Sequence, residues 1–192
     1  MNYFESKNNI VPEKGDLLLS EPFLPDPNFE RSVILLCEHN EQGAFGFVLN
    51  KTTLLSISDV IEGCGEFNEQ LFMGGPVQQD TLHFIHRYGK VLEDCIPIGN
   101  GLYWGGDFDQ LVTLISTGSV SHADFRFFLG YSGWESGQLM HEIEEKSWIV
   151  YKGAGARQIF ESDHESLWRD VLRDMGGRYR MFSNYPTDPR LN

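Results

Sequence analysis

The residues best equipped for chemistry flank two apolar runs, "VILLC" and "FGFVLN", which are joined by the turn sequence "HNEQGA". Arg31 and Ser32 precede the first run, and Asn50 ends the second. Because antiparallel pairing brings together the strand ends opposite a turn, we expect these three side chains to lie within reach of one another. A guanidinium, a hydroxyl and an amide would suit an anionic or carbonyl-bearing group. The alternative is a structural role, in which they satisfy backbone groups at the strand ends.

A second candidate segment is "GGPV", which contains Gly74, Gly75 and Pro76 and follows a predicted strand. The proline restricts one backbone dihedral, and the glycines permit close approach of another backbone or of a ligand. The sequence leaves both uses open.

The third candidate segment is "GYSGWESGQ", which follows the apolar residues "FRFFL". We interpret it mainly as a strand-to-helix corner, in which Ser132 and Glu135 act as a helix cap and its reciprocal partner. Trp134 is expected to anchor this corner by burying its ring. Tyr131 and Gln138 are expected to present polar groups to a pocket.

No catalytic, metal-binding or cofactor-binding set is predicted. The glycine after Ser132 follows it directly, whereas a nucleophile elbow requires G-x-S-x-G. His141 and Glu145 lie one helical turn apart but lack the further ligands that a zinc site needs. His83 and His86 lie three apart in a predicted strand and therefore point to opposite faces. The segment "GAGAR" lacks the third glycine of a dinucleotide fingerprint.

The charge balance argues against direct contact with nucleic acid. The chain has 15 basic and 28 acidic residues, which gives a net charge of −13. Affinity for a phosphate backbone depends on lysine and arginine that displace counterions. The densest basic stretch is "RYR", in which Arg178 and Arg180 are interpreted as partners of nearby acids on a solvated face.

Length and composition indicate one globular domain over residues 1–192, with less order expected at 1–14 and 184–192. Hydrophobic residues make up 41% of the chain, which is ordinary for a globular protein. The three cysteines are widely spaced, and the first residues lack the apolar core of a signal peptide. We therefore expect a cytoplasmic protein without membrane association.

Short apolar runs separated by turn sequences predict strands in most of the chain. Continuous apolar runs, such as "SVILLC", indicate strands that are covered on both faces. The predicted strands are residues 16–20, 32–37, 45–50, 70–74, 81–86, 101–105, 125–131 and 147–153.

Capping signals and apolar stripes predict three helices, at residues 107–118, 137–145 and 162–176. In the first helix, Asp107 is expected to cap the N-terminus, and the Gln110 side chain is expected to reach back to the backbone of the cap residue. In the last, Ser162 and Glu165 are expected to form a capping box. Strands and helices do not alternate strictly, so the expected fold class is α+β.

Four segments in this order and spacing make the chain resemble the YqgE/AlgH family of bacterial proteins. They are "GDLLLSEPFLPDPNFERSVILLCEHNEQGAFGFVLNK", "FMGGPVQQDTLHFIH", "FLGYSGWESGQLMHEI" and "LWRDVLRDMG" followed by "YPTDPRLN". The resemblance implies a mostly antiparallel, bifurcated sheet curled into a pseudo-barrel with flanking helices. It implies no established reaction, although members are sometimes labelled transcriptional regulators. This chain has Ser132 where the family more often has alanine.

Three hypotheses of function remain. The first is a non-catalytic module that binds a protein partner or small ligand in a cleft where the candidate segments converge. The second is a transcriptional regulator, acting indirectly or by binding DNA, and the third is an enzyme that uses Arg31, Ser32 and Asn50 on an anionic substrate. The candidate ligand-binding residues are Arg31, Ser32, Asn50, Gly74, Gly75, Pro76, Tyr131, Trp134 and Gln138.

Overall fold

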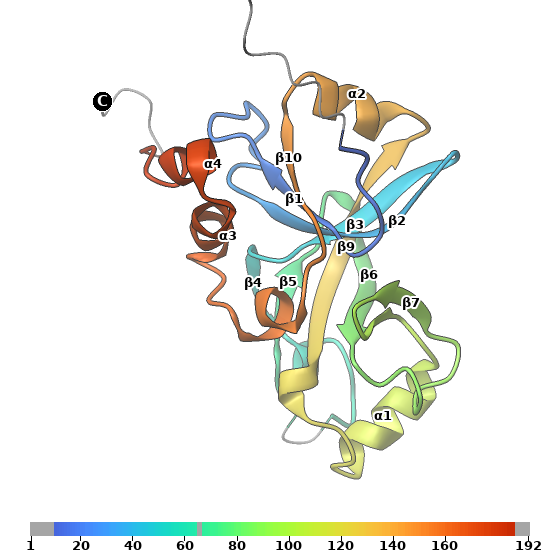
Figure 1. Cartoon of the computed structure of the whole chain (residues 1–192). Coiled ribbons are helices and arrows are strands. Elements are labelled where there is room, and N and C mark those ends of the chain that lie inside the picture. The colour runs from blue at the N-terminus through green and yellow to red at the C-terminus, as the bar shows by residue number, and fades with distance from the viewer. Residues whose placement is uncertain (1–9, 65–66, 187–192) are drawn as a thin grey trace, which may run out of the picture.

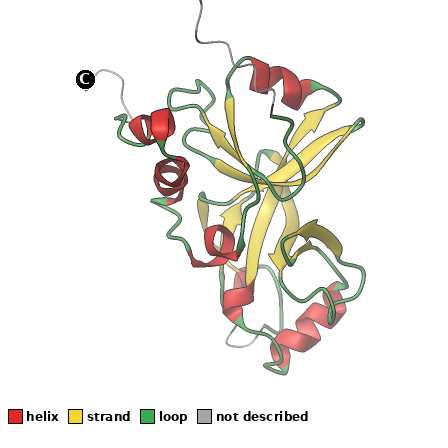
Figure 2. Cartoon of the chain, in the orientation of Figure 1, coloured by secondary structure: helices red, strands yellow, loops and turns green. Residues whose placement is uncertain are grey.

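The computed structural model describes residues 10–64 and 67–186 (Figure 1). Ten strands form a mostly antiparallel sheet that is not closed, and helices flank it (Figure 2). The predicted α+β class and bifurcated sheet are therefore confirmed. The strands are β1 (Leu17–Ser20), β2 (Val33–Asn40), β3 (Gly43–Val48), β4 (Thr52–Ser56), β5 (Gln70–Met73), β6 (Val77–His86), β7 (Ile96–Gly99), β8 (Leu102–Trp104), β9 (Phe125–Glu135) and β10 (Trp148–Tyr151).

The bifurcation comes from β9, which is long enough to belong to both halves of the sheet (Figure 1). Its last four residues pair antiparallel with β3, which continues through β2 and β1 to β10. Its earlier residues pair antiparallel with β6 and parallel with β5. β8 and β7 extend the second half beyond β6, and β4 pairs with β5.

β9 corrects the prediction of a strand-to-helix corner at residues 132–135. The strand does not end at Tyr131 but continues to Glu135, because the free edge of β3 pairs with these residues. Ser132 and Glu135 therefore do not cap the following helix. Trp134 is buried, as expected, but from a position within the strand.

The helices are α1 (Phe108–Ser116), α2 (Gln138–Glu144), α3 (Leu167–Met175) and α4 (Gly177–Phe182). Shorter helical turns are η1 (Ile57–Asp59), η2 (His122–Asp124) and the π-helical η3 (Arg157–Glu161). Asp107 caps α1, since its Oδ1 accepts from the Gln110 backbone N–H at 2.7 Å. The Gln110 side chain does not reach back to the cap. Instead, it accepts from the Glu93 N–H and donates to the Val91 carbonyl, both between β6 and β7.

The last predicted helix begins later than expected. Ser162 ends η3, and its hydroxyl donates to the Arg157 carbonyl at 3.0 Å, so it forms no capping box with Glu165. α3 therefore starts only at Leu167. Its end at Gly176 is as predicted, because this glycine has a φ of +67° that L-residues rarely adopt.

Three clusters of buried side chains explain why the strands read as continuous apolar runs. Along β1, Leu17 and Leu19 pack in the cluster that contains the apolar face of α3. Leu18, between them, packs in the cluster that contains Leu139 of α2. A third cluster lies in the other half of the sheet and contains Leu111 of α1. The sheet in the first half is thus covered on both faces, as the sequence predicted.

Candidate functional site

The open end of the β2–β3 hairpin is closed by the side chain of Asn50. Its Oδ1 accepts from the Val33 backbone N–H at 2.9 Å, and its Nδ2 donates to the Arg31 carbonyl at 2.9 Å. Arg31 and Asn50 are thus brought together, as their places in the hairpin predicted. Both polar groups of the Asn50 amide bind the backbone, so this residue holds the conformation of the chain at Arg31.

Arg31 lies between this hairpin and the C-terminal helices. Its backbone φ is +47°, and its Nη2 donates to the Tyr185 carbonyl at 2.7 Å. Its guanidinium carbon lies 4.9 Å from the centre of the Trp168 ring, within range of a cation–π interaction. Its Nε is buried and has no hydrogen-bond partner within the described part of the chain.

A pocket of about 160 Å³ opens beside this guanidinium. It is lined by Glu30, Arg31, Asn50, Lys51, His164, Glu165, Trp168 and Arg169. The lining joins the open end of the hairpin to the first turn of α3 and the residues just before it.

Three of the lining side chains are basic, and they have no acidic partner in ion-pair contact. Among residues 10–64 and 67–186, no carboxylate oxygen lies within 4.0 Å of the charged nitrogens of Arg31, Lys51 or Arg169. Burial lowers the pKa of Arg31, and the neighbouring Arg169 lowers it further, against an opposing effect of Glu30. Burial also lowers the pKa of Lys51, against opposing effects of the Glu30 and Asp26 carboxylates.

Ser32 lies next to Arg31 in sequence but outside the pocket lining. The residue is fully buried, and its backbone N–H donates to Ser20 Oγ at 2.9 Å. Its own hydroxyl has no partner among the described residues. The structure thus separates Ser32 from the other two candidate residues at the end of the hairpin.

Gly74 and Gly75 lie where the chain after β5 packs closely against the backbones of β3 and β9. The Gly74 carbonyl accepts from the Val48 N–H at 2.9 Å and from the Ser132 hydroxyl at 3.1 Å. A Cβ on Gly75 would lie 2.2 Å from the Tyr131 carbonyl oxygen. The glycines therefore serve the approach of a backbone, which was one of the two uses left open. Pro76 is exposed.

Trp134 and Gln138 lie near the turn end of the hairpin, because Glu135 pairs with Gly43 there. Gln138 accepts from the Glu135 N–H at 2.9 Å and donates to Glu142 at 2.8 Å. Trp134 also donates to Glu142, at 2.8 Å. The prediction of one cleft shared by all the candidate segments is therefore wrong.

Tyr131 is half-buried on β9 and packs against other aromatic side chains. Its ring centre lies 6.3 Å from that of Phe45 and 6.0 Å from that of His83. It does not line the pocket at Arg31.

Sequence reasoning missed the residues that α3 and its preceding turn contribute to the pocket, which are His164, Glu165, Trp168 and Arg169. Trp168 is buried, and its Nε1 donates to the Ser20 carbonyl at 3.0 Å. The polar residues near Trp168, which are His164, Glu165 and Arg169, belong to no recognisable sequence motif. Only the packing of α3 against the hairpin places them near Arg31.

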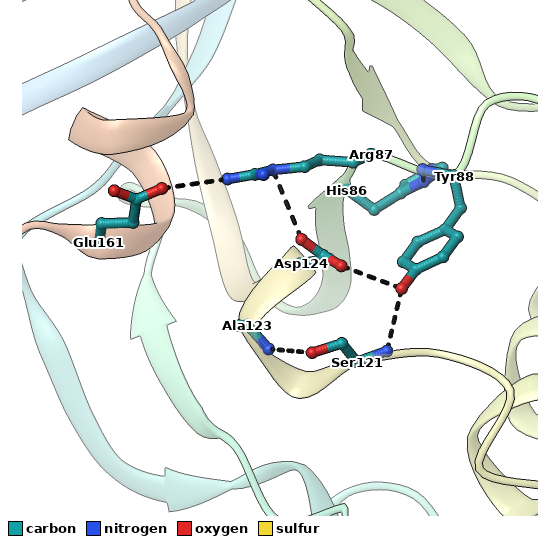
Figure 3. Close-up of polar contacts among 7 residues, drawn as sticks. All are labelled: His86, Arg87, Tyr88, Ser121, Ala123, Asp124 and Glu161. Atoms are coloured by element: carbon teal, nitrogen blue, oxygen red, sulfur yellow. Dashed lines mark hydrogen bonds and ion pairs between the residues drawn. The ribbon is translucent and has the colours of Figure 1, made fainter.

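A second polar cluster joins β6, η2 and η3 (Figure 3). Asp124 accepts from the Tyr88 hydroxyl at 3.0 Å and pairs with Arg87 at 3.5 Å. Arg87 also pairs with Glu161 at 3.5 Å, and the Ser121 N–H donates to the Tyr88 oxygen at 3.0 Å. The polar groups of this cluster bind one another, so we interpret the cluster as a structural link between η2, η3 and the end of β6.

Residues 10–64 and 67–186 contain neither a candidate metal cluster nor a helix that could span a membrane. No group of three or more histidine, cysteine, aspartate or glutamate side chains there is arranged to hold a metal ion. No helix in that part of the chain is long and apolar enough to cross a membrane.

The comparison with known proteins gives a consistent result. Residues 17–180 match the model of a family described as AlgH-like. A UPF0301 protein from Cytophaga hutchinsonii is 53% identical over 180 residues, covering 93% of this chain and 98% of the relative. One from Chlorobaculum tepidum is 46% identical over 182 residues, covering 95% of this chain and 97% of the relative.

Two solved structures share the fold. A crystal structure of a protein from Corynebacterium diphtheriae has a TM-score of 0.75 and 26% identity, covering 91% of this chain and 93% of that one. The solution structure of the AlgH protein from Pseudomonas aeruginosa has a TM-score of 0.72 and 26% identity, covering 97% of this chain and 98% of that one. On the family match and these similarities, the chain belongs to the AlgH-like family.

Proposed function

We propose that this protein is a non-catalytic binding module and that the pocket at the open end of the β2–β3 hairpin binds a small anionic group. One observation carries the proposal. Arg31, Lys51 and Arg169 line the same pocket without an ion-paired carboxylate among the described residues, in a chain with a net charge of −13.

Electrostatics favours an anion in this pocket, because the lining has three cations against the two carboxylates of Glu30 and Glu165. Like charges held close together repel, and partial burial strengthens the repulsion because it weakens solvent screening. The lowered pKa of Arg31 reflects both burial and the neighbouring Arg169. An anion between these side chains would offset the repulsion and would offer an acceptor to the guanidinium, whose Nε has no partner in the described part of the chain.

The size and shape of the pocket indicate the class of ligand. Its volume of about 160 Å³ is below the roughly 300–1,000 Å³ typical of pockets for drug-sized ligands. A phosphate or carboxylate group fits this size, either as a small ion or as one end of a larger molecule. Arginine suits both groups, because its planar guanidinium can donate two parallel hydrogen bonds.

The enzyme hypothesis is less well supported by the same contacts. The Ser32 side chain is buried outside the pocket lining, and both polar groups of the Asn50 amide are bound to the backbone. The regulator hypothesis is compatible with a binding module if regulation acts through a ligand and a protein partner. Direct DNA binding is disfavoured by the acidic charge balance.

A titration followed by two-dimensional ¹H–¹⁵N NMR tests the location of the site. Inorganic phosphate and citrate are added separately, so that phosphate and carboxylate chemistry are distinguished. We expect saturable shifts of the Arg31, Lys51 and Arg169 amide signals with at least one anion. Signals of Gly133 and Gln138, at the other end of the hairpin, should stay unchanged. Shifts that are absent, or spread evenly over the chain, would overturn the proposal.

A further inference from the structure

The helix α1 lies at the end of the molecule opposite α2 (Figure 1). A second hollow, larger than the pocket at Arg31, is lined in part by residues of α1. Its volume is about 820 Å³, and it is open to solvent along one side. We call it the α1 groove. It is lined by Val60, Ile61, Glu62, Asp80, Leu82, Phe108, Asp109, Val112, Thr113 and Leu129.

Six of the ten residues that line the α1 groove are apolar, and the other four are polar or acidic. Val60 on one side is 43% exposed, and Phe108 on the other is 41% exposed. Between them lie the half-buried side chains of Leu82, Val112 and Leu129. The exposed side chains of Val60 and Phe108 therefore offer apolar contacts to a partner, next to the polar lining residues.

The rim of the α1 groove is acidic. Glu62, Asp80 and Asp109 line it, and no basic side chain does. None of these three carboxylates forms an ion pair with a residue in the described part of the chain. A cationic partner would therefore meet acids that have no competing partner there.

Local contacts hold both walls of the α1 groove in place. On one side, Asp59 accepts from the backbone and hydroxyl groups of Ser56, both at 2.8 Å, which fixes η1. On the other side, α1 is capped by Asp107, and the Gln110 side chain donates to the Val91 carbonyl in the segment between β6 and β7. The groove is thus already shaped for a partner, which lowers the cost of ordering it on binding.

We infer that the α1 groove docks an amphipathic, lysine- or arginine-bearing segment of a partner protein. Apolar side chains of the segment cover Val60, Phe108 and Val112, while its cations face the three rim carboxylates. The open side favours a protein segment over a small molecule, because small-molecule sites usually bury about 70–90% of their ligand. The acidic rim repels nucleic acid and anionic lipid.

This inference is independent of the proposed anion pocket. The two sites share no lining residue. Either site can therefore fail its test without affecting the other.

The test uses fluorescence anisotropy with synthetic helical peptides and the full chain. The first probe has leucine on one face and lysine on the other. A second probe replaces each lysine with glutamate, and a third replaces each leucine with alanine. We expect the leucine–lysine probe to bind at least about tenfold more tightly than either of the others.

A pair of charge-reversal variants localises the binding. The groove variant combines Glu62→Lys, Asp80→Lys and Asp109→Lys. The control variant combines Glu41→Lys, Glu144→Lys and Glu145→Lys. All six positions are exposed, and both variants change the net charge equally.

Only the groove variant should weaken binding of the leucine–lysine probe, by at least about tenfold. Phe108→Ser, which changes an exposed side chain and no charge, should also weaken it. Circular dichroism checks that each variant is folded, and Phe108→Ser keeps the test valid if the groove variant is not. Absence of probe binding, equal weakening in both charge variants, or equal affinity of the alanine–lysine probe would overturn the inference.

Discussion

The guanidinium carbon of Arg31 lies 4.9 Å from the centre of the Trp168 ring, so a cation from the hairpin meets an aromatic face from α3. Trp168 is held in place by its own hydrogen bond to the Ser20 carbonyl. The Arg31 backbone is held by Asn50. The positions of Arg31 and Trp168 are therefore fixed by contacts to other residues. The remaining N–H donors of the Arg31 guanidinium lie beside the pocket.

Asn50→Ala should destabilise the protein by about 1–3 kcal/mol, because it leaves two backbone groups of the hairpin without their side-chain partner. Urea unfolding followed by circular dichroism measures the change. The control is Asn28→Ala, at an exposed position, which should stay within about 0.5 kcal/mol of the unmodified protein. Equal effects of the two substitutions would show that Asn50 does not hold the end of the hairpin.

Glu142→Ala should destabilise the protein by about 2–3 kcal/mol, since hydrogen bonds to charged groups contribute more than neutral ones. One carboxylate oxygen of Glu142 accepts from Trp134 Nε1 at 2.8 Å and from Trp148 Nε1 at 2.7 Å. Tryptophan fluorescence should change as well. Glu144→Ala, an exposed position on the same helix, should change neither stability nor fluorescence.

Gly130→Ala should destabilise the protein by at least about 2 kcal/mol, through backbone strain and overlap together. Gly130 has a φ of +66°, and a Cβ there would lie 2.7 Å from the Val77 carbonyl oxygen. Gly133→Ala is the matched control in the same segment. Its Cβ would meet only the edge of the Tyr131 ring, at 3.2 Å, so a smaller loss is expected in thermal unfolding. An equal loss of stability in the two variants would contradict the close packing of the β9 backbone against Val77 at Gly130.

The stability of the protein should fall as the pH drops below about 6.5, in part because of His86. This histidine is fully buried, and burial lowers its pKa, against an opposing hydrogen bond to the Gly105 carbonyl. Its Nδ1 accepts from the Tyr88 N–H at 3.0 Å, so the neutral ring with a proton on Nε2 satisfies both contacts.

The sign of this pH effect follows from the direction of the shift. A lowered pKa means that the unfolded chain binds the proton more readily than the folded one, so acid favours unfolding. His86→Gln should flatten the dependence of the unfolding free energy on pH between about 5 and 7. His141→Gln, at an exposed position, serves as the control. An unchanged slope in His86→Gln would contradict the assignment.

The hairpin, the Asp107 cap and the end of α3 at Gly176 were predictable because their signals are local. An apolar run, a turn sequence or a capping residue acts through neighbours in the chain. The continuation of β9 through Ser132 and Glu135 was not predictable in this way. Glycine, serine and glutamate are typical of a turn, and only the distant edge of β3 makes them strand residues.

The candidate site was predictable only in part, for the same reason. Arg31 and Asn50 follow from the pairing of two adjacent strands. Arg169 lies far away in the sequence, on a helix whose polar face looked solvated. Its place beside Arg31 depends on how α3 packs on the sheet, which no local pattern encodes.

Isothermal titration calorimetry with inorganic phosphate and with citrate tests the central claim most directly. The account predicts saturable binding of at least one anion and binding at least about tenfold weaker in Arg169→Glu. Arg178→Glu, which makes the same charge change outside the pocket lining, should bind like the unmodified protein. No saturable binding of either anion, or equal binding by all three proteins, would contradict an anion pocket at Arg31.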